Sequence, residues 1–225
     1  MKRILLQTCA LGALLVSSCT KVSEKSFQSP EGESLFYASI EASADTRAYA
    51  DENLRVLWDA NDRVSIFNRY TLNEQFRFTG QTGDNSGWFE PVPQEAFGTG
   101  NELDLVYAVY PYRQSTSISN SGILTVELPD YQVYRQDSFG LGANTMVSAT
   151  EDNHLLFRNA CGYLVLKLYG KDVKVSSITL YGSFEEPIAG KAQVKMTPDG
   201  VPELKMGSEA ATRVTLTCPE PVALG

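Results

Sequence analysis

The strongest constraint on the fold of this chain is the alternation of apolar and polar residues at a period of two. In residues 35–42, the side chains of Phe36, Ala38, Ile40 and Ala42 fall on one face of an extended chain. Successive side chains of a strand point to opposite faces of a sheet, so this pattern predicts a half-buried strand.

The same signal recurs along the chain. Strand patterns are found at residues 63–67, 75–79, 103–110, 122–128, 162–169, 173–181, 191–196 and 212–217. Residues 103–110 are almost entirely apolar or aromatic, which is typical of a strand buried on both faces. No segment keeps a 3.6-residue apolar period long enough to predict a helix. Short strands separated by turn residues predict an all-β protein built of β-sandwiches.

Two domains are predicted, spanning residues 33–150 and 151–225. Glycines and the acidic pair Glu151–Asp152 gather between the two groups of strand patterns. Only four strand patterns remain for the second domain, which is few for a closed sandwich. The pattern is still strand-like near Gly225, so we expect the second domain to be incomplete, with an exposed groove or a ragged edge.

The amino terminus has the order of a secretory signal. Two positive charges within residues 1–3 precede a mostly apolar stretch, and two small residues then precede Cys19. This order predicts a signal peptide over residues 1–18. The segment resembles a bacterial lipobox, in which the cysteine is lipidated and becomes the new amino terminus. The alternative is an ordinary cleaved signal with an incidental cysteine; a transmembrane helix is disfavoured because the apolar stretch is short.

Lipidation of Cys19 would tether the mature chain to a membrane outside the cytoplasm. Residues 19–32 are rich in Ser, Lys, Glu and Pro and contain few apolar residues. Such a segment cannot bury enough surface to fold, so we expect a flexible linker.

Composition argues against a nucleic-acid partner. The formal net charge is −8, whereas a nucleic-acid-binding protein needs a basic face.

Cys9 leaves with the signal, and Cys161 and Cys218 remain in a compartment where disulfides persist. These two residues either form a disulfide or stay as separate buried thiols.

No catalytic or metal-binding motif stands out. The single histidine, His154, is interpreted as a turn residue rather than a base. Asp59, Asn61 and Asp62 carry oxygen ligands that hint at calcium, but the rest of an EF-hand loop is absent, and a polar turn is favoured. The chain is therefore not predicted to be an enzyme, to bind a metal or to need a cofactor.

The aromatic residues allow two interpretations. Trp58 and Trp88 could form a glycan-binding platform on a surface lipoprotein, or they could be ordinary core residues. Core packing is favoured, and a glycan-binding surface lipoprotein remains the alternative function.

Several stretches together resemble the Bacteroides-type fimbrillin family. Residues 46–48 and 57–67 (TRA and LWDANDRVSIF) are similar to its opening motif, although Asn61 stands where the family usually has glycine. Residues 107–112 (YAVYPY) resemble a characteristic strand. Residues 156–164 (LFRNACGYL) resemble the entry into its second domain, and residues 175–180 and 188–190 the hairpin that follows.

The resemblance implies two transthyretin-like sandwiches in tandem, in a lipoprotein on the surface of the outer membrane. Such proteins are stalk, tip or anchor subunits of fimbriae. Their partners are other fimbrial subunits and, in adhesion, host or bacterial surface receptors. Assembly in the family resembles strand donation, in which an arginine-directed protease removes an early strand. Carried onto this chain, Arg47 and Arg55 are the candidate cleavage sites, and the removed strand contains Phe36, Ala38 and Ile40.

Overall fold

The computed structural model describes residues 35–41, 56–94, 100–136 and 138–225. The described residues form strands and no helix, which confirms the all-β prediction. They are β1 (Phe36–Ile40), β2 (Arg63–Phe67), β3 (Glu74–Phe78), β4 (Ser86–Pro91), β5 (Val106–Tyr110), β6 (Ser117–Ile118), β7 (Ile123–Leu128), β8 (Tyr131–Val133), β9 (Met146–Thr150), β10 (His154–Asn159), β11 (Lys174–Tyr181), β12 (Gly190–Lys195), β13 (Glu203–Met206) and β14 (Arg213–Ala223).

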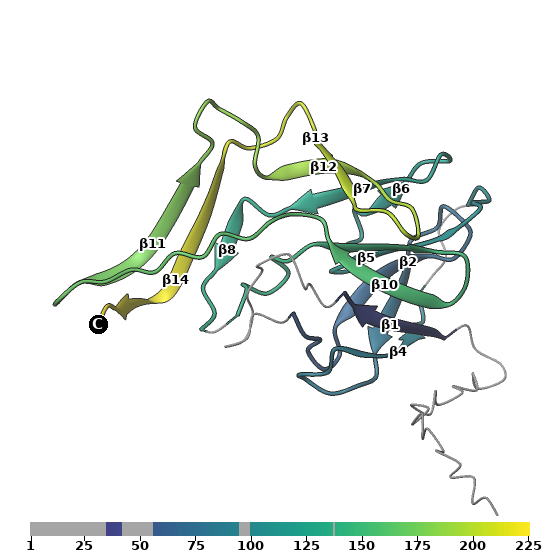
Figure 1. The fold of residues 1–225 in the computed structure, drawn as a ribbon, viewed down its shortest axis with the longest axis horizontal. Coiled ribbons are helices and arrows are strands. Elements are labelled where there is room, and N and C mark those ends of the chain that lie inside the picture. The colour runs from purple at the N-terminus through teal and green to yellow at the C-terminus, as the bar shows by residue number, and fades with distance from the viewer. Residues whose placement is uncertain (1–34, 42–55, 95–99, 137) are drawn as a thin grey trace, which may run out of the picture.

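Seven strands close into a barrel in the order β1-β10-β9-β5-β2-β3-β4 (Figure 1). Its neighbouring strands are antiparallel except β1 and β10, which run parallel. Its interior is filled by large apolar side chains, among them Trp58, Phe76, Phe78, Phe89 and Phe157. Closure leaves these strands without a free edge.

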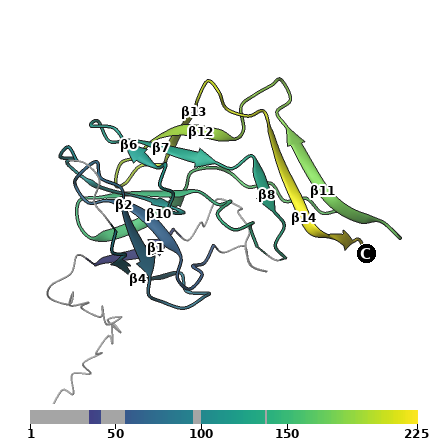
Figure 2. The same cartoon turned by 180° about the vertical axis from the view of Figure 1, so that it is seen from behind.

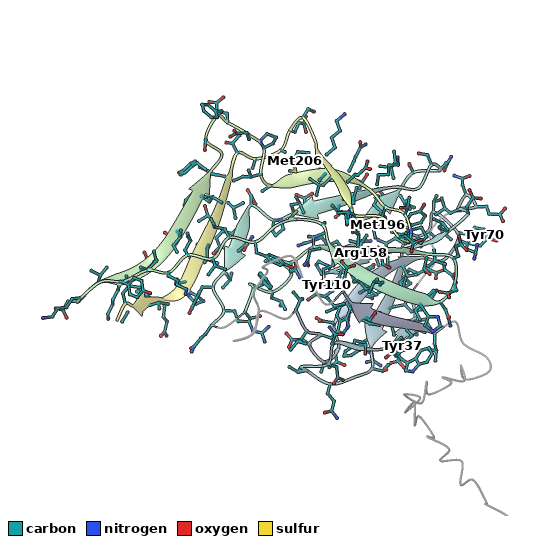
Figure 3. The ribbon with its side chains drawn as sticks, in the orientation of Figure 1. Tyr37, Tyr70, Tyr110, Arg158, Met196 and Met206 are labelled. Carbon is teal, nitrogen blue, oxygen red and sulfur yellow. The ribbon has the colours of Figure 1, made fainter. Side chains whose placement is uncertain are left out.

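A second sheet, in the order β13-β12-β7-β6, packs on the outer face of the barrel. The core between them joins residues of β2, β5 and β9 to residues of β7 and β12. Met196 and Met206 lie on this side of the molecule (Figure 3). β5 is therefore buried on both faces, as its continuous apolar run predicts.

A third sheet, in the order β11-β14-β8, extends away from the barrel (Figures 1 and 2). It has little cover, since Tyr131, Leu180 and Tyr181 are all exposed. Residues 162–170 belong to no sheet, although the sequence predicts a strand at residues 162–169. The third sheet therefore consists of three strands, and it leaves large side chains exposed.

Strand pairing continues across the predicted domain boundary. The boundary at residues 150/151 falls in the turn between β9 and β10, which are neighbours in the barrel. β12 also pairs with β7, which lies on the other side of that boundary in sequence. The strands of the predicted second domain therefore contribute to all three sheets.

Candidate functional site

The sequence resemblance singles out β1, and the structure places this strand inside the barrel wall. β1 pairs in parallel with β10 and antiparallel with β4. The amide of Tyr37 donates to the carbonyl of Asn153 at 2.9 Å, and the amide of Glu41 donates to that of Phe157 at 2.9 Å. On the other edge, the Ile40 amide donates to the Asn85 carbonyl at 3.1 Å. β1 is thus hydrogen-bonded along both edges.

The side chains of β1 alternate between the core and the outer surface. Phe36, Ala38 and Ile40 are 3%, 0% and 4% exposed and lie in the barrel core. This confirms the face predicted from their spacing; Ala42 lies outside the described residues. The ring of Phe36 contacts that of Phe76 edge to face, with centroids 5.3 Å apart. Burying a side chain such as Phe or Ile contributes about 1.5–3 kcal/mol, so two large residues of this short strand hold it in place.

Arg158 of β10 connects the end of β1 to the second sheet. Its Nε donates to Oε1 of Glu41 at 2.9 Å, directly after β1. Its Nη1 donates to the carbonyls of Pro198 and Gly200, at 2.9 and 3.0 Å, in the connection between β12 and β13. The position of Arg158 between the barrel and β12 is visible in Figure 3. No local sequence pattern marks Arg158, because its three partners are distant in sequence.

The outward face of β1 carries a row of rings. Tyr37 lies opposite Trp88 of β4 on one side and opposite His154 of β10 on the other. The Tyr37 and Trp88 rings meet edge to face with centroids 5.2 Å apart, and the Tyr37 hydroxyl donates to the Ser86 hydroxyl at 3.0 Å. Tyr37 marks this side of the barrel in Figure 3.

Trp58 packs in the core, as the favoured interpretation predicts, and so does not share a surface with Trp88. Trp58 is 1% exposed and lies inside the barrel, where its ring meets those of Phe89, Tyr110 and Phe157 edge to face. Trp88 lies on the outward face. The wall of the barrel separates the two, because side chains of consecutive strand positions alternate between inside and outside.

In the polar turn between Trp58 and β2, the carboxylates accept hydrogen bonds from groups of the protein itself. The amide of Asp59 donates to Oδ2 of Asp62 at 2.8 Å, and the Tyr110 hydroxyl donates to Oδ1 of Asp62 at 3.2 Å. Arg135 Nη1 donates to Oδ2 of Asp59 at 2.8 Å. Asn61 has a φ of 65°, a left-handed conformation that asparagine tolerates. These bonds fit the polar turn that the sequence favours over a calcium loop. Among the described residues, no group of three or more His, Cys, Asp or Glu is placed to hold a metal.

Asp62 should make the stability of the protein depend on pH. Burial raises its pKa from 3.8 to about 6. The folded protein therefore takes up a proton at higher pH than the unfolded chain, so the contribution of Asp62 to stability should rise as the pH falls from about 6 to about 4. We expect Asp62→Asn to reduce this rise, measured as the free energy of unfolding in urea between pH 4 and 7. An unchanged pH dependence in the variant would contradict the assignment to Asp62.

The remaining candidates are separate from β1 or outside the described residues. His154 begins β10 and is exposed; its amide donates to Oδ1 of Asp152 at 2.7 Å. Cys161 is exposed, Cys218 is buried, and both are free thiols. Cys19, Arg47 and Arg55 lie outside the described residues.

Comparisons with known proteins add no relative: no family model, curated protein or solved structure matches the chain. No helix in the described part of the chain is long and apolar enough to span a membrane.

Proposed function

We propose that this chain is a fimbrial subunit or fimbria-associated lipoprotein of the bacterial surface, tethered through Cys19 until it is processed and assembled by strand donation at the position of β1. The domains would be of the transthyretin-like sandwich type, joined in tandem. The signal sequence and the fimbrillin-like motifs support the location and the family. The assembly mechanism rests on one observation, the place of β1 between β10 and β4.

β1 has the properties that strand exchange requires. It is five residues long, and it enters the barrel from a part of the chain far from both neighbours in sequence. Its removal would leave two unpaired strand edges and an apolar groove lined by Phe76, Phe89 and Phe157. An added strand would regain main-chain hydrogen bonds with both edges, and alternating apolar side chains would set its register.

Cleavage after Arg47 or Arg55 would separate β1 from the rest of the chain, since both lie between β1 and β2 in sequence. We expect an arginine-specific protease to cut the protein there and the protein then to bind a synthetic peptide of residues 33–43. The same peptide with Ala38→Glu should bind at least about tenfold more weakly, because Ala38 is fully buried and an unpaired charge is costly there. Binding is measured by fluorescence anisotropy of the labelled peptides.

The matched control is the double variant Arg47→Ala, Arg55→Ala, which should resist cleavage and fail to bind the peptide. Equal binding of the two peptides would contradict strand exchange at β1. Amino termini found only at Cys19 in protein isolated from surface filaments would show that the subunit is not processed in assembly.

A further inference from the structure

Residues 162–170 form an apolar length of chain without a partner strand. They connect β10 to β11 (Figure 1). Leu164, Leu166 and Leu168 are 62%, 50% and 44% exposed. Within the described residues, no backbone group of this segment forms a hydrogen bond to another backbone group. Such a segment presents amides, carbonyls and apolar side chains together, which makes it a template for a strand.

The sequence of the segment is nearly a palindrome. It reads Gly-Tyr-Leu-Val-Leu-Lys-Leu-Tyr-Gly, and its centre is Leu166. Reversed, only the Val165 and Lys167 positions differ. An antiparallel pair of two identical segments centred on Leu166 therefore matches leucine with leucine, tyrosine with tyrosine and glycine with glycine. The six leucines of such a pair share one face, because they occupy alternate positions.

The charges of the segment agree with self-pairing. Lys167 is its single charged residue. In the centred register each Lys167 lies opposite Val165 of the other copy, so the two ammonium groups are not directly opposed. The aliphatic part of the lysine can then cover the valine while its charge stays in water.

β11, the strand that follows in the same chain, is a poorer partner. A hairpin through the turn at Lys171–Asp172 would place Leu166 opposite Ser177 and Leu164 opposite Thr179 of β11. Ser177 and Thr179 lie on the hydroxyl-bearing face of the third sheet, opposite Thr217 and Thr215 of β14. The leucines would therefore share that polar face, while Ile178 and Leu180 occupy the other. Because a strand's side chains have a period of two, this register puts the apolar sides of the two strands on opposite faces.

We propose that residues 162–170 pair with the same residues of a second copy of this chain, as an antiparallel strand pair with a two-fold axis at Leu166. This is an isologous contact, so it closes on itself and gives a dimer. It is independent of the strand exchange proposed for β1. The contact is small, which places the dimer among the weaker protein interfaces.

Cysteine cross-linking tests the register directly. In the centred pair the two Leu166 Cα atoms lie about 4.5–5.5 Å apart, within the range of a disulfide. Full-length Leu166→Cys, in a background with Cys9, Cys19 and Cys161 replaced by serine, should form a disulfide-linked dimer on mild oxidation. The matched control is Leu168→Cys, which is similarly exposed but lies far from its own copy in this register. We expect the Leu166→Cys dimer to form at least about tenfold faster, and a mixture of Leu164→Cys and Leu168→Cys chains to give mixed dimers.

Sedimentation velocity of the unmodified full-length chain over a range of concentrations supplies the second measurement. We expect a monomer–dimer equilibrium, and Leu166→Lys should raise its dissociation constant by roughly tenfold or more, because like charges then face each other. Circular dichroism checks that the variants are folded. Equal cross-linking rates for Leu166→Cys and Leu168→Cys, or a chain that stays monomeric at every concentration, would overturn the proposal. Intramolecular pairing with β11 and binding of an unlike strand both predict the monomer.

Discussion

Replacing Trp58 with alanine should lower the free energy of unfolding by about 3–5 kcal/mol, the range measured when large buried aromatic residues are truncated. Trp58 is fully buried, and its ring contacts four aromatic neighbours, Phe78, Phe89, Tyr110 and Phe157. The change therefore leaves a cavity in the middle of the barrel core. Urea denaturation followed by circular dichroism measures the loss.

Phe184→Ala is the matched control for Trp58→Ala. Phe184 is also a large aromatic residue, but it is 87% exposed, so its truncation should change the free energy of unfolding by less than about 0.5 kcal/mol. Similar losses for the two variants would show that Trp58 is not a core residue, and would reopen the interpretation of Trp58 as a surface contact.

Replacing Ala38 with aspartate should destabilise the barrel by about 3–5 kcal/mol, because the carboxylate would enter an apolar core without a partner. Ala38 is completely buried and lies opposite Gly87 of β4 and Leu155 of β10. β1 can avoid the free-energy cost of burying this carboxylate by leaving the barrel. We therefore expect faster hydrogen exchange at the amides of β4 and β10 that face β1, with smaller changes in β7 and β12.

Ser39→Asp provides the control on the same strand. Ser39 follows Ala38 directly, and its side chain is half-buried on the outward face. A carboxylate there stays in contact with water, so the loss should be below about 1 kcal/mol. Equal hydrogen-exchange rates at the β4 and β10 amides in the two variants would mean that β1 does not leave the barrel when a charge is placed at its buried position.

The faces of the strands could be predicted from the sequence better than their partners could. The alternation in β1 identified Phe36, Ala38 and Ile40 as core residues, and the apolar run of β5 predicted burial on both faces. By contrast, no strand pattern in the sequence predicts β9 or β10. The glycines before β9 and the acidic turn after it resemble a linker, but the glycines lie in the connection from β8 of the third sheet to β9, and the acidic turn joins the neighbouring barrel strands β9 and β10. Local composition does not distinguish a loop within a sheet from a connection between domains.

The residues of the candidate site show the same difference: burial could be predicted from the sequence better than partners could. Trp58 precedes a polar turn, and its indole lies in the barrel core, as the favoured interpretation predicts. Arg158 gave no signal, because its role depends on Glu41, Pro198 and Gly200 coming together in space. The leucines of residues 162–170 show the opposite case, since their period predicted a strand and the structure leaves them unpaired.

By itself, the sequence determined that this is an all-β protein and which side of β1 faces a core. These properties follow from the two-residue period, which depends only on the local geometry of an extended chain. The tertiary structure alone decided that β1 closes a barrel between β4 and β10, and that residues 162–170 belong to none of the three sheets. Pairing depends on which distant segments reach the same edge with matching faces, and no local pattern contains that information.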